Sequence, residues 1–368
     1  MRIQAVISQA ILSLDSDPDS PFYQRIQTSD DKKDDIRCIS LTSLFRVLDT
    51  GFYFLGSRRG DVVEYGPLWS NEGNDATKIR TLYILNNWFN TIREAVPDWW
   101  DAGSGEGGGL SMNDSVTACI MVLRSVFQHL ATHGVNLLVL SKEELFERVT
   151  PFVSALGNYL ASLTEDERKQ YRALRGIQGQ TTRAKRAEQA IHQSIPEFFP
   201  PGLKEFIEKV KARTNDRAKT IVDKIERILQ TTIIEELKRE VGPEETQWWM
   251  QGIPSKIRMK TSDKYEEDSG KRGGKEFYFD LIDYRDIISS QWNLFQKLFG
   301  YGRGNASKEK RTAWINFVND IRKIVAHSSS GRSVSLEQLA ELEMYEKWLD
   351  NQIKQVDDNE NPPSDDES

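Results

Sequence analysis

Apolar residues recur at spacings of three and four along most of the chain, and alternating runs of β-branched residues are scarce. This period is typical of helices with one buried face, so the pattern predicts a mainly α protein. We expect helices at 76–100, 112–133, 142–163, 203–240, 279–299, 308–327 and 335–356. Proline should end the first of these at Pro97 and interrupt the third near Pro151.

A chain of 368 residues is long enough for two or three packed units. The composition changes at residue 248, since five of the nine tryptophans lie from that point onward. We therefore predict a helical region at 1–202, a long connecting helix within 203–247, a separate C-terminal bundle at 248–356 and a disordered acidic tail at 357–368. Within the bundle, the polar segment 260–276 should be an exposed loop or a disordered insertion.

The formal net charge is −7, but six acidic residues lie in the last twelve positions, so the rest of the chain carries a net charge of only −1. No run approaches the roughly 18 apolar residues of a membrane span. The first residues also lack the features of a signal peptide, so we expect a soluble, cytoplasmic protein. The two cysteines, Cys38 and Cys119, stand far apart and offer neither a disulfide framework nor a cysteine zinc site.

A glycine-rich segment, AGSGEGGG, occupies residues 102–109. It lacks the Gly-Lys-Ser/Thr ending with which a P-loop holds phosphate and magnesium. We therefore interpret it as a mobile loop.

Residues 168–187 hold seven lysines and arginines and no acidic residue. In a nearly neutral body, such a strip is a candidate for binding nucleic-acid phosphates, and a solvated basic face is the alternative. The candidate phosphate-binding residues of this strip are Arg172, Arg175, Arg183, Lys185 and Arg186.

The segment 308–335 carries the strongest chemical signal. On a helix that advances about 100° per residue, one apolar side collects Trp314, Phe317, Val318, Ile321 and Val325, with Ile324 at its margin. The other sides carry four polar residues: Asn319, Arg322, Lys323 and His327. The Ser-Ser-Ser-Gly turn that follows places His327 at a helix C-terminus, where the helix dipole favours the imidazolium form and proton exchange near neutrality.

These residue types suit the cleavage of RNA without a metal. The reaction needs a base for the 2′-hydroxyl, an acid for the leaving 5′-oxygen and a cation for the phosphorane oxygens. His327 suits the proton transfers, and Arg322 suits the phosphate because a guanidinium stays charged and binds two oxygens. One histidine does not easily serve both ends of the scissile bond, so a second copy of the chain should complete the site as a homodimer.

The residues of this segment resemble a known family. The string Arg322-Lys-Ile-Val-Ala-His327 resembles the Arg-x4-6-His signature of HEPN domains, and the similarity extends over 279–300, 312–327 and 335–353. The resemblance implies a dimeric helical bundle that acts as a metal-independent endoribonuclease and as a toxin-like effector in anti-phage defence. It implies that Arg322 and His327 are catalytic, that Asn319 orients them, and that Lys323 or Arg311 assists phosphate binding.

One position departs from that family pattern. Active HEPN nucleases frequently carry Asn, Asp or His directly after the arginine, whereas this chain has Lys323. The lysine suits phosphate binding and is also compatible with a domain that binds without cutting.

The segments 4–26, 80–100 and 172–203 are similar to the later portion of DGQHR-domain proteins, which include DndB-like factors of DNA modification and phage defence. The defining Asp-Gly-Gln-His-Arg string is absent, so either a separately encoded half acts as a partner or this is a reduced member. In this scheme the N-terminal part senses or restrains the nuclease.

The alternative function is a non-catalytic nucleic-acid-binding or scaffold protein that uses the 168–186 strip. A third possible function is a docking surface for an antitoxin or a nucleotide on the HEPN-like face.

Other candidate residues favour structural roles. His129 and His133 have the i, i+4 spacing of metal ligands, but Leu130 stands where a zinc protease needs Glu and no third ligand is evident. We expect neither a metal site nor a cofactor. Two adjacent tryptophan pairs are expected to be hydrophobic anchors at helix ends rather than base-stacking platforms: Trp99 with Trp100, and Trp248 with Trp249.

Overall fold

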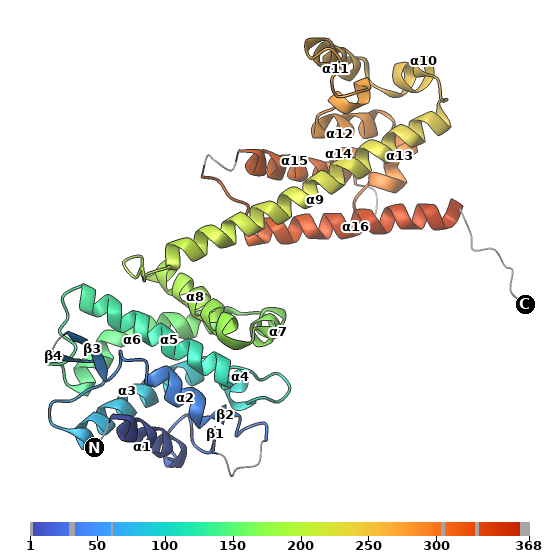
Figure 1. The fold of residues 1–368 in the computed structure, drawn as a ribbon. Helices are drawn as coiled ribbons and strands as arrows, with labels where there is room; N and C mark the ends of the chain where they lie inside the picture. Colours follow the sequence, from blue (N-terminus) through green and yellow to red (C-terminus); the bar gives the residue numbers. More distant parts are fainter. Residues whose placement is uncertain (1–2, 29–33, 60–61, 303–305, 328–330, 361–368) are drawn as a thin grey trace, which may run out of the picture. The chain divides into compact units, whose positions relative to one another are not determined.

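The computed structural model describes residues 3–28, 34–59, 62–302, 306–327 and 331–360 (Figure 1). Almost all of its regular structure is helical, which confirms the mainly α prediction. The chain divides into two compact units, residues 1–207 and 208–368, and the division falls inside one long helix, α9 (Leu203–Glu240). No helix among the described residues has the length and apolar character that crossing a membrane requires.

The first unit is a helical assembly with two small pairs of strands. Its helices are α1 (Ile3–Ser16), α2 (Leu41–Leu48), α3 (Asn74–Ala95), α4 (Pro97–Asp101), α5 (Asn113–Thr132), α6 (Lys142–Ser162), α7 (Glu165–Ala173) and α8 (Gly176–Ser194). Strands β1 (Ile26–Gln27) and β2 (Ile39–Ser40) pair in parallel, and β3 (Leu55–Arg59) and β4 (Val62–Tyr65) pair antiparallel. Helix α3 packs between α1 and α6, and α5 packs against α8.

The core of this unit follows the apolar face of α3 and continues through α4. The predicted break at Pro97 is confirmed: α3 ends at Ala95, and α4 begins with the proline at its first position, where the missing N–H costs no helical bond. Trp99 and Trp100 are buried directly after it, and Trp100 Nε1 donates to the carbonyl of Pro21 at 3.2 Å. The prediction that this pair anchors a helix end is therefore confirmed.

The predicted interruption near Pro151 is wrong. Helix α6 is continuous from Lys142 to Ser162 and contains the proline. Pro151 is an exposed residue, and so is Glu147, whose carbonyl loses its helical donor to the proline. The opposite face keeps Val153 and Leu156 buried, and this packing outweighs the local cost of the proline.

The second unit contains most of α9 and the elements after it. These are α10 (Glu245–Gln247), a π-helical turn η1 (Trp248–Gly252), α11 (Ser255–Glu267), a 3₁₀ turn η2 (Lys275–Tyr278), α12 (Leu281–Ser290), α13 (Trp292–Phe299), α14 (Lys308–Arg311), α15 (Ala313–Ala326) and α16 (Leu336–Glu360). Trp248 and Trp249 are buried in its core, which confirms their expected role as anchors.

Helix α9 has the predicted bounds, but it is a core element and not only a connector. A row of its apolar residues is completely buried within the second unit: Ala218, Ile221, Ile225, Leu229, Ile233 and Leu237. The second core therefore begins at Ala218, well before Trp248. The prediction failed because a helix with one apolar stripe looks the same in sequence whether it links two cores or completes one of them.

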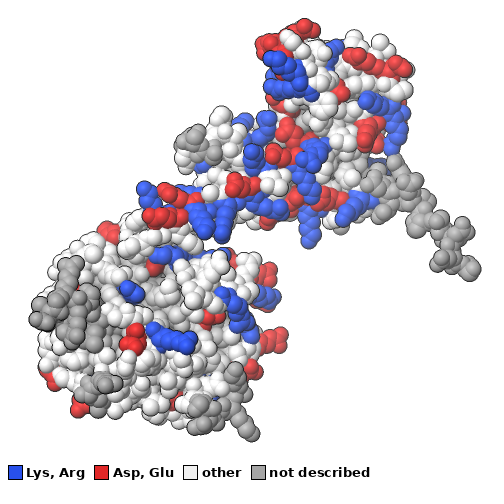
Figure 2. Space-filling model, in the orientation of Figure 1, with Lys and Arg blue, Asp and Glu red and all other residues white. Residues whose placement is uncertain are grey.

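Ion pairs join the polar sides of α9 and α16. Arg217 contacts Glu343 and Glu346 at 3.1 and 3.2 Å, and Lys224 contacts Glu346 and Asp350 at 3.0 and 2.6 Å. Figure 2 shows lysine and arginine interspersed with aspartate and glutamate along these two helices. Such partly exposed pairs contribute little stability each, so the buried stripe holds α9 in place and the ion pairs favour its orientation.

Several predicted boundaries in this unit are corrected by tertiary contacts. Segment 260–276 is not a disordered insertion, because α11 extends to Glu267 and Lys260 and Lys264 pair with Asp280 at 2.8 and 2.7 Å. The helix expected at 279–299 breaks at Gln291, and the one expected at 308–327 breaks at the buried Thr312.

The predicted acidic tail at 357–368 is only partly covered by the structure. Helix α16 continues to Glu360, beyond its predicted end at 356. Residues 361–368 lie outside the described residues.

Truncating a leucine in the α9 stripe should destabilise the second unit. Leu229→Ala removes a side chain that is completely buried, and substitutions of this kind cost about 2–5 kcal/mol. The control is Leu336→Ala in α16, where the side chain is 65% exposed and the change should stay within about 0.5 kcal/mol. Urea denaturation of both variants measures the difference, and equal midpoints would contradict the assignment of α9 to this core.

Candidate active site on helix α15

Helix α15 holds the predicted catalytic residues by burying its opposite side. Trp314, Val318 and Ile321 are buried as predicted, and Ile315, which the predicted stripe omitted, is buried too. Trp314 Nε1 donates to the carbonyl of Phe299 at 3.0 Å, which fixes the start of α15 against the end of α13. The polar side of α15 is thereby directed outward.

His327 caps the C-terminus of α15, as its position before the serine-rich turn predicted. Its backbone N–H bonds the carbonyls of Lys323 and Ile324 at 3.2 and 3.3 Å, and its side chain is exposed. The backbone is thus held while the imidazole reaches solvent. Residues 328–330 of the turn lie outside the described residues.

An open pocket of about 730 Å³ lies at this end of the helix. Its wall contains Asp320, Lys323, Ile324, His327 and Arg332. Lys323 Nζ pairs with Asp320 at 2.9 Å along the helix surface, and both side chains are largely exposed. The pocket therefore brings a lysine, an arginine and a histidine to one place, with one carboxylate beside the lysine.

Sequence reasoning missed Arg332 and Asp320. Asp320 was visible as the acid three residues before Lys323, a spacing that pairs charges on a helix. Arg332 lies outside the helices, so helical periodicity does not predict its position. Its place in the pocket depends on the path of the chain after α15.

Arg322 faces a different direction, toward α9. Its Nε lies 3.5 Å from Glu226 Oε2, and its side chain remains 42% exposed. His327 lies five positions after Arg322, which places the two residues about 140° apart around the helix axis. Arg322 is not among the described residues that line the His327 pocket, so one chain does not bring the predicted pair to a single cavity.

Glu226 is a further functional candidate that the sequence did not reveal. Burial raises its pKa above the ordinary value, the positive charge of Arg322 opposes that rise, and Asp223 and Asp280 add to it. Tyr284 packs nearby, and its burial raises the pKa of its hydroxyl far above the ordinary value. Arg322 is therefore held by a carboxylate that is itself poorly solvated.

Asn319 is half-buried on the same helix, one turn before Arg322 and Lys323. This position is compatible with the orienting role that the family resemblance implies for it.

Arg311 has structural contacts in this chain, and phosphate binding by it stays a prediction from the sequence. It lies in α14, and its Nη2 donates to the carbonyls of Gln296 and Gly300 at 3.3 and 2.9 Å. Its guanidinium also lies over the ring of Trp292, 5.3 Å from the centroid. These contacts tie it to the C-terminal end of α13.

Tertiary contacts lower the number of cations in the basic strip at 168–187 that are available to phosphate. Arg183 is only 2% exposed and donates to the carbonyl of Tyr171 through Nε and Nη2 at 3.1 and 2.7 Å, so its assignment to phosphate is wrong. Lys185 pairs with Glu188 at 2.6 Å and bonds the carbonyl of Pro201 at 2.8 Å. Arg172 is engaged by carbonyls of the glycine-rich segment.

Arg175 and Arg186 are exposed and stay candidates for phosphate contact. They lie in or beside α8, and the strip as a whole no longer forms one row of seven available cations.

His129 and His133 contact each other and apolar neighbours. Their rings lie 4.1 Å apart, and His129 packs edge-on against Phe152 and Phe198. Within the described ranges, no group of three His, Cys, Asp or Glu residues is placed to hold a metal ion.

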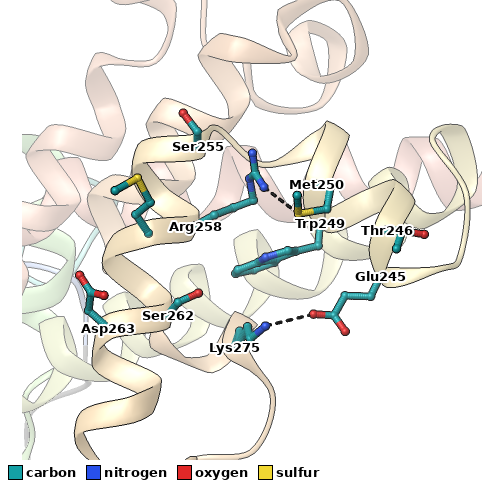
Figure 3. A pocket seen from close by; sticks show the side chains of 10 residues that line it. Glu245, Thr246, Trp249, Met250, Ser255, Arg258, Ser262, Asp263 and Lys275 are labelled. Atoms are coloured by element: carbon teal, nitrogen blue, oxygen red, sulfur yellow. Dashed lines mark hydrogen bonds and ion pairs between the residues drawn. The ribbon is translucent and has the colours of Figure 1, made fainter.

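A larger cavity of about 810 Å³ lies between η1 and α11 (Figure 3). Trp249 lies within its wall, with Arg258 and Lys275 on either side of it. Lys275 pairs with Glu245 at 3.2 Å, and Arg258 donates to the carbonyl of Ile253 at 3.1 Å. Its cations therefore already have partners, and the cavity is separate from the candidate site on α15.

No protein-family model, curated protein or solved structure matches this chain. The resemblances to HEPN and DGQHR domains accordingly stay predictions from the sequence.

Replacing Glu226 should change how stability depends on pH. The raised pKa means that the folded chain holds this proton more tightly than the unfolded chain. The resulting stability is fully present below the ordinary pKa and is lost as the pH rises through the folded pKa. Because Glu226→Gln does not titrate, its free energy of unfolding relative to wild type should increase between pH 4 and pH 7.

Urea denaturation at four pH values over this range measures the effect. The control is Glu235→Gln, an exposed carboxylate on the same helix, and the increase for Glu226→Gln should exceed that for Glu235→Gln. A relative stability that stays constant or falls with pH would contradict the buried environment of Glu226.

Proposed function

We propose that this protein is a metal-independent endoribonuclease of the HEPN type that acts as a homodimer in the cytoplasm. The observation that carries the proposal is the pocket at the end of α15, where His327 lies with Lys323 and Arg332. Two cations suit the binding of a phosphodiester, and an imidazole beside them suits one of the two proton transfers. A toxin-like role in anti-phage defence follows from the family resemblance alone.

The chemistry assigns one role to each kind of side chain. A neutral imidazole takes the proton of the 2′-hydroxyl, the 2′-oxygen attacks phosphorus, and an imidazolium donates a proton to the departing 5′-oxygen. The products are a 2′,3′-cyclic phosphate and a 5′-hydroxyl. Lys323 and Arg332 neutralise the charge that develops on the phosphorane oxygens.

The positions of Arg322 and His327 support a dimeric site. Because they face different directions on α15, the Arg322 of one chain does not line the pocket of its own His327. A twofold pairing of two α15 helices would supply a second imidazole and the two Arg322 guanidinium groups to one phosphate. Arg322 keeps enough exposure for that contact while Glu226 orients it.

A second candidate function is RNA or DNA binding without cleavage. The observation that favours it is charge compensation, since Arg322 is paired with Glu226 and Lys323 with Asp320. In this case the protein would be a scaffold or regulator of a DNA-modification or defence system, with Arg175 and Arg186 as further contacts. A separately encoded DGQHR-containing protein or an antitoxin is the proposed partner in either case.

Removing the imidazole of His327 should abolish cleavage. Labelled tRNA and mRNA are incubated with purified protein in EDTA, and His327→Ala should lower the rate by at least about 100-fold, the usual contribution of general acid–base catalysis. Arg322→Ala should produce a similar loss. The control is His133→Ala, which removes an exposed histidine from the C-cap of α5 and should leave the rate unchanged.

The same assay separates the two candidate functions. If wild type and variants are equally inert while salt-sensitive nucleic-acid binding persists, the protein is a binding module and the nuclease proposal is wrong.

A site shared between two chains should make the inactive variant dominant. His327→Ala chains are titrated into a fixed amount of wild type, with RNA in excess so that binding by the variant does not deplete it. The activity of each wild-type chain should fall toward zero as mixed dimers replace wild-type dimers. Activity that is unaffected by the added variant would show that each chain cleaves RNA by itself.

A further inference from the structure

The pocket at the end of α15 includes one residue from the segment that leads into α16. Arg332 lies in the pocket wall, although it belongs to no helix and its side chain is exposed. An exposed arginine outside regular structure has many accessible conformations. Its place in the pocket therefore depends on how the backbone beside it is held.

Val334, two positions after Arg332, anchors this segment to the second unit. Its side chain is only 3% exposed and belongs to the core of that unit. The next residue caps α16: Ser335 Oγ accepts from the N–H of Gln338 at 3.1 Å, and Gln338 Oε1 accepts from the N–H of Ser335 at 2.9 Å. Reciprocal bonds of this kind fix the start of a helix. The chain directly after Arg332 is thus held by burial and by a cap.

A side chain of α9 supplies a further contact to the same segment. Asn215 Oδ1 accepts a hydrogen bond from the N–H of Val334 at 2.9 Å, across 119 positions of sequence. Asn215 is half-buried, and Thr214 and Ala218 beside it on α9 are buried. A partly buried backbone N–H that lost its acceptor would be destabilising. Asn215 therefore ties the segment at 331–335 to α9.

Asn215 and Glu226 lie on the same side of α9. Glu226 follows Asn215 by eleven positions, which places the two residues about 20° apart around the helix axis. Glu226 contacts Arg322 of α15, and Asn215 contacts the segment after α15. One side of α9 thus holds both the candidate catalytic arginine and the backbone next to Arg332.

We propose that Asn215 is a positioning residue for Arg332, an inference that rests on the proposed nuclease function. Asn215 is not among the described residues that line the pocket, so it does not act on the substrate directly. It holds the N–H of Val334 and thereby fixes the backbone two positions from Arg332. Arg332 is then already beside His327 and Lys323 when negative charge develops on the phosphorane oxygens, and this arrangement accelerates the reaction.

Steady-state cleavage of labelled tRNA by the full chain tests the role of Asn215. Asn215→Ala removes the acceptor, and kcat should fall about 10-fold or more because a small displacement of a catalytic group is costly. KM should change less than kcat, since Arg332 acts mainly on charge that develops in the transition state. Asn215→Asp keeps an oxygen that accepts from Val334, so its kcat should stay close to that of the wild type.

A double-mutant cycle tests whether Asn215 acts through Arg332. The four proteins are wild type, Asn215→Ala, Arg332→Ala and the double variant. Adding Asn215→Ala to Arg332→Ala should lower kcat no further, because the group that Asn215 positions is already absent. A second, independent loss of kcat in the double variant would overturn the proposal.

Gln230→Ala is the matched control. Gln230 is also half-buried on α9, and its Nε2 donates to the carbonyl of Glu276 at 3.1 Å, 46 positions away. The variant loses a comparable long-range hydrogen bond that is not connected with the pocket. Its stability in urea should fall about as much as that of Asn215→Ala, but its kcat should equal that of the wild type. An equal fall of kcat in both variants would show a general loss of structure and overturn the proposal.

Hydrogen exchange of the Val334 amide measures the contact without cleavage. The amide should exchange faster in Asn215→Ala than in the wild type and in Gln230→Ala, because its acceptor is gone. Equal exchange rates would contradict the tie between Asn215 and the segment at 331–335. If circular dichroism shows that Asn215→Ala is unfolded, Asn215→Ser takes its place, since its shorter side chain does not reach Val334.

The outcomes separate this inference from the proposed function. A wild-type chain that does not cleave RNA would overturn the nuclease function and the role of Asn215 with it. A wild-type chain that cleaves RNA, together with an Asn215→Ala variant of equal kcat, would overturn the role of Asn215 alone.

Discussion

Burial of the apolar stripe on α9 is the constraint on which the second unit depends. The stripe runs from Ala218 to Leu237 and supplies one side of a core that α12, α13, α15 and α16 complete. Glu226 follows Ile225 directly, so the burial of Ile225 brings the carboxylate to the edge of that core, where it meets Arg322. The orientation of the candidate catalytic arginine is thus a consequence of hydrophobic packing on another helix.

The same packing explains why the two halves of the predicted motif diverge. The buried side of α15 determines which way the other sides face, and a spacing of five residues then directs Arg322 and His327 to different surfaces. The two ends of a motif that is short in sequence therefore lie in two different environments. Arg322 meets an acid of its own chain, and His327 meets the cations Lys323 and Arg332 in a pocket.

Local patterns predicted most of the fold, and long-range contacts account for what they missed. The bounds of α9, the break at Pro97 and the buried residues Trp314 and Ile321 follow from periodicity and backbone chemistry within one helix. The burial of Arg183 and the carbonyl contacts of Arg311 depend on residues in neighbouring elements. A charged side chain has the same sequence signature whether it faces phosphate, water or a backbone carbonyl.

In the candidate site, too, local patterns predicted some features and long-range contacts determined the others. The exposed end of α15 and the capping position of His327 were predictable, because both follow from one helix and the turn after it. The partners of the site residues were not, since Glu226 lies 96 positions before Arg322 and is brought there only by the packed core.

The contacts of Arg172 affect how the first unit assembles. Its contacts join α7 to carbonyls that lie 64 to 68 positions earlier in the chain, so the glycine-rich segment gains its shape only after the chain has closed a long loop. The ordering of the end of α7 is therefore coupled to that of the glycine-rich segment, so fraying of the last turn of α7, where Arg172 lies, would loosen a segment far away in sequence.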